Sequence, residues 1–352
     1  MSIAASLASP SDSGWLRSVR FDLNFILGTT AIALASGWAV HMDPALLTPI
    51  LILDIWLLGQ HHVVSTFTRM CFSKDDLAKH RFLVFQLPFV IVAGVLAAGF
   101  GFGWWILGST YFYWQWFHYT RQSWGISQFY RRKAGGRADE NEWATKLAFY
   151  LPPLWGILHR SWQAPTEFLG LHFKVLPVSG TVVEIVGFAA IAAVSWWLVM
   201  RIIAWHRGEF ALAHMLYMAT HHIVFFTGYL LLEDVTQGWL VINIWHNAQY
   251  ILFVWLQNNN RFKDGIDPAA RSLSTLCQSD KVIRYFAVCL GISTLLYIGI
   301  KVSSVAIGDV GLPLLIVIYQ IINFHHYVVD AVIWRSKKKN TVPGAAAGAR
   351  GG

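Results

Sequence analysis

Stretches of about twenty mostly apolar residues follow one another along almost the whole chain, separated by short polar connections. Each stretch has the length a helix needs to cross a bilayer. Only 13% of the residues are charged and 55% are hydrophobic, whereas a soluble domain carries about 25% charged residues. The sequence therefore predicts an all-α, polytopic transmembrane helical bundle of about ten spans, at roughly 23–41, 46–67, 82–103, 106–128, 144–158, 182–204, 210–231, 238–256, 283–302 and 311–334.

The fifth stretch is short and contains Pro152 and Pro153. Proline removes a backbone donor and disturbs a helix interior. The alternative is nine spans with a kinked or re-entrant segment here. We expect a single transmembrane domain over 22–334, preceded by a cytoplasmic segment 1–21 and followed by a basic, disordered cytoplasmic tail 335–352.

Basic residues mark every second connection between the predicted spans. Lys and Arg gather on the cytoplasmic side of membrane proteins, so both termini are expected in the cytoplasm of a multi-pass protein, in a bacterial-type inner membrane. The residues that carry this pattern include Arg17, Arg20, Arg69, Lys74, Arg131, Arg132, Arg201, Arg207, Arg261, Lys263 and Arg335. The same placement explains the net charge of +8. We therefore expect membrane lipids, and no nucleic acid, as partners.

Cys71, Cys277 and Cys289 show no paired spacing, which excludes a disulfide framework and a CxxC metal site. The chain also has no GxGxxG or GxxxxGK[ST] motif for a nucleotide or flavin.

Histidines recur inside five of the apolar segments, where ionisable side chains are costly and usually mark function. At a rise of 1.5 Å per residue, they lie roughly 10 to 22 Å from the predicted cytoplasmic helix ends. One cluster in the cytoplasmic half of the bundle is therefore compatible with the sequence. The candidate metal ligands are His61, His62, His118, His221, His222, His246, His325 and His326.

Polar residues share helix faces with several of these histidines. Tyr319, Asn323, His326 and Asp330 step by 4, 3 and 4 and form one stripe. Asp330 is expected to bind a metal or to orient an imidazole. In a regular helix, Asp54 would share a face with His61. Adjacent histidines point about 100° apart, so each HH pair supplies one ligand and leaves the second open.

A metal centre would satisfy these buried groups, since neutral imidazole is a common ligand of iron, zinc and copper. Eight or nine ligands predict two iron ions, with zinc or copper as alternatives. The competing interpretation is a hydrogen-bonded polar core that packs the bundle.

The multi-histidine pattern resembles the integral-membrane non-haem iron enzymes, such as fatty-acid desaturases and hydroxylases, and more distantly the Brp/Blh-like carotene dioxygenases. The desaturase boxes HxxxH and HxxHH are absent from this chain. The resemblance implies an oxidoreductase, such as a monooxygenase or desaturase, that uses O₂, an apolar or lipid-like substrate and a cytoplasmic electron donor.

Residues close to the histidines are expected to handle the substrate. Arg121 and Gln122 would orient a substrate head group or a water and act with Asp330 as the catalytic residues. Aromatic residues near the site either line an apolar substrate channel or pack the membrane interface and the core, namely Trp114, Trp116, Tyr250 and Tyr327. The alternative functions are a haem-binding membrane protein and a transporter of metal ions or protons.

Overall fold

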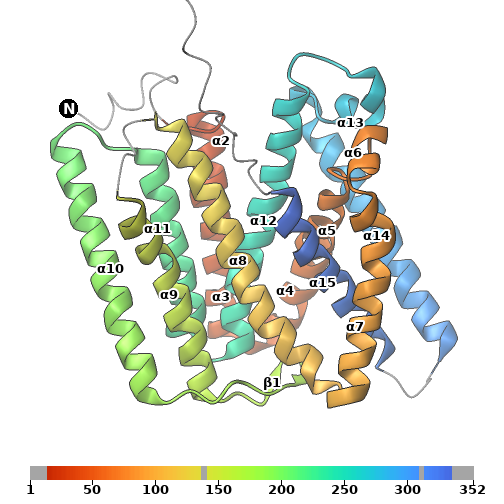
Figure 1. The fold of residues 1–352 in the computed structure, drawn as a ribbon, viewed down its shortest axis with the longest axis horizontal. Coiled ribbons are helices and arrows are strands. Elements are labelled where there is room, and N and C mark those ends of the chain that lie inside the picture. The colour runs from red at the N-terminus through yellow and green to blue at the C-terminus, as the bar shows by residue number, and fades with distance from the viewer. Residues whose placement is uncertain (1–13, 136–140, 309–312, 335–352) are drawn as a thin grey trace, which may run out of the picture.

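The computed structural model describes residues 14–135, 141–308 and 313–334, which are almost all helical. The predicted tail 335–352, most of the predicted N-terminal segment and the first residues of the last predicted span lie outside these ranges. Helices run up and down beside one another in Figure 1, and a small hairpin lies at the lower edge. Its strands, β1 (Glu167–Phe168) and β2 (Leu171–His172), pair antiparallel.

Helices account for the rest of the regular structure. The long ones are α3 (Thr29–Met42), α7 (Leu87–Phe102), α8 (Trp105–Lys133), α9 (Glu142–Gln163), α10 (Gly180–His206), α11 (Leu212–Phe226), α12 (Val235–Arg261), α14 (Val282–Ile307) and α15 (Leu314–Ile333). The short ones are α2 (Val19–Leu23), α4 (Leu47–Asp54), α5 (Gln60–Phe67), α6 (Lys74–Lys79) and α13 (Arg271–Leu276). In the described ranges, π-helical turns join or extend them at Asn24–Gly28, Ile55–Gly59, Phe82–Gln86 and Thr227–Leu231, and 3-10 turns lie at Pro44–Leu46, Pro268–Ala270 and Ser279–Lys281.

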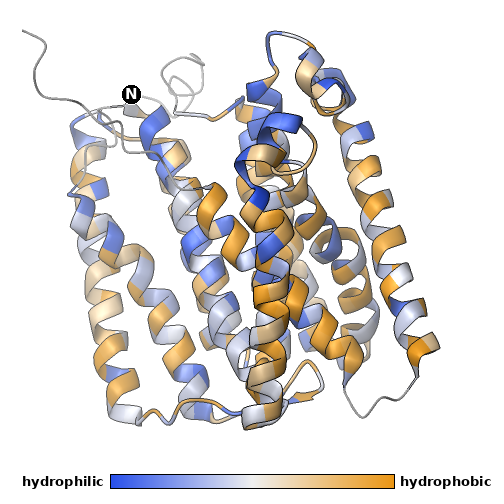
Figure 2. Ribbon diagram, turned by 45° about the vertical axis from the view of Figure 1, so that its right-hand side comes forward, coloured by the Kyte–Doolittle hydropathy of each residue, from blue (hydrophilic) through white to orange (hydrophobic). Residues whose placement is uncertain are grey.

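Six helical stretches in the described ranges are long and apolar enough to cross a membrane. They are Val19–Met42, Pro44–Phe67, Phe82–Phe102, Gly180–His206, Ser279–Ile307 and Leu314–Ile333. Large apolar side chains on their outer faces are exposed, including Phe89, Phe188 and Ile283. Figure 2 shows hydrophobic residues along the outer helices and hydrophilic residues gathered at the upper end. These features support a membrane protein.

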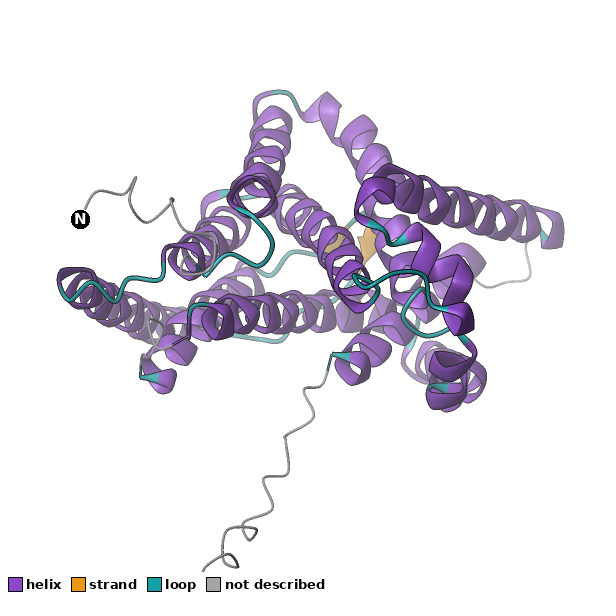
Figure 3. Cartoon of the chain, turned by 90° about the horizontal axis from the view of Figure 1, so that it is seen from above, coloured by secondary structure: helices purple, strands orange, loops and turns teal. Residues whose placement is uncertain are grey.

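The remaining four predicted spans coincide with α8, α9, α11 and α12. These helices are less apolar because several of their polar side chains face the interior of the bundle. The most buried of these helices is α12, whose buried polar residues include Asn243, His246, Asn247, Gln249 and Asn258. The predicted count of ten spans and the predicted orientation stay predictions. Figure 3, seen from above, shows the long helices packed beside one another.

The proline-containing segment is helical over the 22 residues of α9, with Pro152 and Pro153 inside it. No break separates α9 into two pieces. Each proline leaves the carbonyl four residues earlier without its helical donor. For Pro153 that carbonyl belongs to Phe149, and the imidazole of His221 lies 3.1 Å from it. A side chain from a neighbouring helix thus replaces the missing backbone donor.

The π-turn Thr227–Leu231 packs backbone against backbone on α12. A Cβ atom at Gly238 would overlap the carbonyl oxygen of Gly228. The buried guanidinium of Arg160 lies at the same place, where it donates to the carbonyls of Gly228, Leu232 and Glu233. This junction connects α9 to α12 through the π-turn, because Arg160 bonds the turn and the turn packs on Gly238 of α12.

Candidate metal centre

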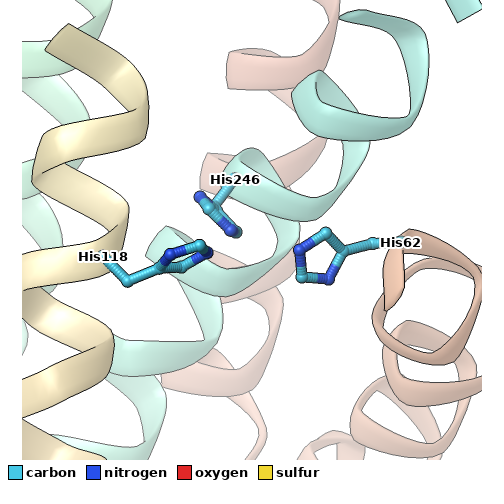
Figure 4. A group of neighbouring side chains, drawn as sticks. All are labelled: His62, His118 and His246. Carbon is cyan, nitrogen blue, oxygen red and sulfur yellow. The ribbon is translucent and has the colours of Figure 1, made fainter. Parts of the chain in front are cut away.

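Five buried side chains from four helices meet in the interior of the bundle. His62 comes from α5, His118 from α8, His246 from α12, and His326 and Asp330 come from α15. Figure 4 shows the imidazoles of His62, His118 and His246 directed toward one another from three separate helices. Ligand atoms of these three lie within 4.8 Å of one another, and the same holds for His118, His326 and Asp330.

The distances place the two groups around one centre. The imidazole of His62 lies 4.3 Å from that of His326 and 5.2 Å from that of His246, between ring centroids. The centroid of His118 lies 5.0 Å from His246 and 5.1 Å from His326. Oδ2 of Asp330 is 3.7 Å from Nε2 of His326 and 3.9 Å from Nε2 of His118.

The atoms that face this centre lack hydrogen-bond partners. Nε2 of each of the four histidines and Oδ2 of Asp330 are buried and make no hydrogen bond within the described ranges. Leaving one buried polar atom unpaired costs free energy, and native structures contain few of them. Four imidazole nitrogens and one carboxylate oxygen are a ligand set that suits iron, zinc or copper. The residues therefore fit a metal ion.

A chain of hydrogen bonds indicates which nitrogen of His326 carries the imidazole proton. The Tyr250 hydroxyl donates to Oδ1 of Asp330 at 2.5 Å, so it accepts from Thr66 at 2.8 Å. Because the Thr66 hydroxyl has one proton, it accepts from Nδ1 of His326 at 3.1 Å. Nδ1 then carries the imidazole proton and Nε2 keeps its lone pair for a metal. Outer partners of this kind orient metal ligands and raise their basicity.

A second chain supports the opposite side of the centre. The Tyr119 ring lies 4.1 Å from the ring of His246, and its hydroxyl donates to Asn243 at 2.5 Å. Asn243 in turn donates to Oδ2 of the buried Asp54 at 2.5 Å. Asp54 is therefore linked to the candidate centre through Asn243 and Tyr119.

The prediction that Asp54 shares a helix face with His61 is wrong. The π-turn Ile55–Gly59 lies between them and adds one residue to the helix turn. His62 therefore takes the angular position that His61 would have in a regular α-helix. Asp54 and His62 both face α12, where they meet Asn243 and His246.

Two other predicted ligands are the neighbours of residues in the centre, and they point elsewhere. The His61 ring packs edge-on against Phe286, with centroids 5.9 Å apart. Nε2 of His325 lies 2.7 Å from the carbonyl oxygen of Leu83. Each HH pair in α5 and α15 thus supplies one residue to the centre, because adjacent side chains diverge by about 100°.

The His221–His222 pair also lies away from the centre. His221 is stacked on Phe149, with ring centroids 3.7 Å apart, and bonds to Ser123 and to the Phe149 carbonyl. His222 packs edge-on against Trp197. Of the eight candidate ligands the structure brings four together, His62, His118, His246 and His326.

The residues predicted to act on substrate border a cavity of about 290 Å³ beside the centre. His118, Arg121, Gln122 and Asp330 all line it. Its aromatic walls include the predicted Trp114, Tyr250 and Tyr327. Trp116 is not among them, since its indole donates to the carbonyl of Pro153.

Sequence reasoning missed Thr66 and Tyr119. Thr66 lies four residues after His62, a spacing that places both on one helix face. Tyr119 had no such signal, because the position next to His118 on a helix normally faces elsewhere. Comparisons with protein-family models, with curated proteins and with solved structures found no match to this chain.

Proposed function

We propose that this chain is an integral-membrane, metal-dependent oxidoreductase of the oxygenase or desaturase type, acting on an apolar or lipid-like substrate. The observation that carries the proposal is the meeting of five buried ligand atoms, none with a hydrogen bond in the described part of the chain, inside a bundle of membrane-type helices. A polar core that only packs the bundle would pair these atoms with one another or with neighbours.

The centre is proposed to hold one ion. Two ions of five or six coordination would need eight or nine ligands, whereas the centre offers five, from His62, His118, His246, His326 and Asp330. Five candidate protein ligands exceed the four of a structural zinc site, which favours iron. We therefore propose iron, and metal analysis distinguishes it from zinc or copper.

Each surrounding residue then has a role. Iron held by these residues would supply activation of O₂. Asp330 is held by Tyr250 with one oxygen turned to the centre. Arg121 and Gln122 stand at the cavity beside it, where they orient the polar end of a substrate, and Trp114 and Tyr327 give its apolar part a dry wall. With no nucleotide or flavin motif in the sequence, electrons come from a cytoplasmic donor.

The proposed topology is a multi-pass protein of about ten spans with both termini in the cytoplasm, in a bacterial-type inner membrane. The alternation of basic connections supports it. Accessibility of single cysteines, placed in successive loops of intact cells, tests this arrangement.

Metal analysis and an absorption spectrum of the purified full chain test the central claim. We expect one iron per chain and no Soret band. A Soret band would instead favour the haem-binding alternative. A folded protein without stoichiometric metal, or one that moves metal ions or protons across vesicles, would overturn the proposal.

A further inference from the structure

One face of α8 forms a wall of the cavity beside the candidate centre. The wall residues step along the helix by 4, 3, 4, 4 and 3, a spacing that keeps them in one stripe. They are Trp114, His118, Arg121, Gly125, Phe129 and Arg132. Since His118 belongs to the candidate centre, the stripe continues the cavity along α8 on both sides of it.

The two sides differ in polarity. The Arg and Gln residues of α8 that line the cavity all come after His118, and they are Arg121, Gln122, Gln128 and Arg132. Before His118, the lining residues of α8 are Trp114 and Phe117, and Phe117 is 46% exposed. The candidate centre therefore lies between a part of the cavity that carries cations and a part that is apolar.

Both guanidiniums lie at the cavity wall and within reach of a ligand. Nη2 of Arg121 donates to the carbonyl of Ala331 at 3.4 Å, and the guanidinium of Arg132 lies 4.4 Å from the centre of the Phe129 ring. Ala331 and Phe129 line the cavity too. Both arginine side chains are exposed, and within the described ranges neither forms an ion pair.

Asp330 is the one acidic residue that lines this cavity in the described part of the chain. Its Oδ1 accepts from Tyr250, and its Oδ2 faces His118 and His326. The carboxylate is thus directed to the candidate centre. Arginine stays charged, and a cation without a counter-charge is costly among membrane-type helices. An anionic group in the cavity would supply that counter-charge.

Gly125 leaves room for such a group between the two arginines. A Cβ atom at this position would meet no other atom within 4 Å. Glycine inside a helix is less stable than alanine, and no close backbone contact requires it here. The open space lies on the face of α8 that also carries Arg121 and Arg132. A charge there is attracted by both guanidiniums without touching both.

We propose that this cavity binds an amphiphile with a hydrocarbon chain and an anionic head, a carboxylate or a phosphate. The head lies over Gly125, in the field of Arg121 and Arg132. The chain runs past the candidate centre toward the apolar part at Phe117. Only the fate of the chain at the centre rests on the proposed function, because binding depends on the guanidiniums and does not require the metal.

Dodecyl compounds that differ only in the head group test the charge. The full chain is placed in phosphatidylcholine nanodiscs at alkaline pH, where a carboxyl head is ionised, and binding to empty nanodiscs is subtracted. We expect radiolabelled dodecanoate or dodecyl phosphate to bind saturably, and the tighter of the two identifies the head. Its unlabelled form should displace it at least about 10-fold better than dodecanol or dodecyltrimethylammonium, which lack a charge-assisted hydrogen bond to arginine. Equal displacement by either of these, or saturable binding of neither anion, overturns the proposal.

The same measurement on chelator-treated protein separates this inference from the proposed function. The preference for the anion should persist there, because the guanidiniums remain. A preference that disappears with the metal would show that the head binds the metal itself, and would refute the inference. A protein that prefers the anion but holds no stoichiometric metal would overturn the proposed function alone.

Charge variants locate the head. Arg121→Gln and Arg132→Gln should each lower the preference for the anion at least about 3-fold, the effect of one partly exposed charge. Lys133→Gln is the matched control, because it removes the neighbouring cation at the same end of α8, which does not line the cavity. An unchanged preference in both arginine variants would contradict the proposal.

A blocking variant tests the position of the ligand. Gly125→Leu places a side chain in the open space and should abolish binding of every dodecyl compound, while its higher helix propensity supports the fold. Gly125→Ala adds only a methyl group to the same space and should keep binding. Unchanged binding in folded Gly125→Leu protein would place the ligand elsewhere and refute the inference.

Discussion

The Tyr250 hydroxyl donates a 2.5 Å hydrogen bond to Oδ1 of Asp330, and this leaves Oδ2 of the same carboxylate directed toward the imidazoles of His118 and His326. The ring of Tyr250 also lies 4.7 Å from His62. One fully buried tyrosine on α12 thus orients a carboxylate of α15 and packs against a histidine of α5.

Removing that hydroxyl should weaken metal binding while leaving the fold intact. In Tyr250→Phe, Asp330 loses its orienting donor and the Thr66 hydroxyl loses Tyr250 as its acceptor, so we expect a 10- to 100-fold drop in metal affinity. Competition with a chelator measures it. Tyr285→Phe is the control, because it removes a buried hydroxyl that bonds Thr68 away from the centre. Equal metal retention in the two variants would contradict this role of Tyr250.

The adjacent histidine pairs provide an internal comparison. His62→Ala and His326→Ala each remove a ligand atom, and metal affinity should fall at least about 100-fold, more than an outer partner contributes. His61→Ala and His325→Ala change a neighbouring position on the same helices and should keep the metal. Metal content per folded chain decides between them. Similar losses at both members of a pair would favour a general packing role for these histidines.

Removing the guanidinium of Arg160 should lower the stability of the fold and have little effect on metal affinity. Its guanidinium is 1% exposed and donates to Gly228 at 2.9 Å and Glu233 at 2.6 Å, and also to Leu232. Arg160→Met leaves these buried carbonyls unpaired, so the free energy of unfolding should fall by about 3 kcal/mol or more. Thermal unfolding in detergent measures the loss, and Arg207→Met at an exposed position serves as control. A wild-type transition in Arg160→Met would show that water or backbone replaces the guanidinium.

Acid should weaken the contact between α6 and the end of α12. Oδ2 of Asp76 lies 2.6 Å from a guanidinium nitrogen of Arg261. Partial burial opposes ionisation of Asp76, but hydrogen bonds from Ser73 and Arg261 and the charge of Arg261 outweigh it and hold its pKa below the usual 3.8. A lowered folded-state pKa stabilises the fold above the unfolded pKa, and this stability is lost as pH falls through the folded value.

Stability measured from pH 6 to pH 3 should therefore decline less steeply in Asp76→Asn than in the wild type. The partners are partly exposed, so the difference is expected to stay below about 1 kcal/mol. Parallel stability curves for the two proteins would show that Asp76 does not contribute to the loss of stability in acid. Asp75→Asn, one residue earlier, is the matched control.

Much of α15 could be predicted from the sequence. The stripe Tyr319, Asn323, His326 and Asp330 repeats at helical spacing. In the structure His326 and Asp330 belong to the centre, and Tyr319 and Asn323 line a cavity of about 300 Å³ that reaches the centre at His62. The same regularity failed for α4 and α5, because the π-turn Ile55–Gly59 rotates α5 relative to α4. Periodicity predicts which residues share a face only while the helix stays regular.

His221 shows a second limit. Its segment looked like a metal-binding segment because a histidine inside an apolar stretch needs a partner. The partner is the carbonyl of Phe149, left without its helical donor by Pro153 of another helix. Proline and histidine lie far apart in the sequence, so their relation is decided by how α9 packs beside α11.

Hydropathy and helical spacing are local properties of the chain, and they were enough to predict mostly apolar helices with histidines inside them. It took the folded arrangement to establish that His62, His118, His246 and His326 meet with Asp330, while His61, His221, His222 and His325 face other partners. Convergence depends on the rotation and packing of four separate helices. The rotation depends on a π-turn between α4 and α5, and the packing depends on a glycine contact and a buried arginine that join separate helices.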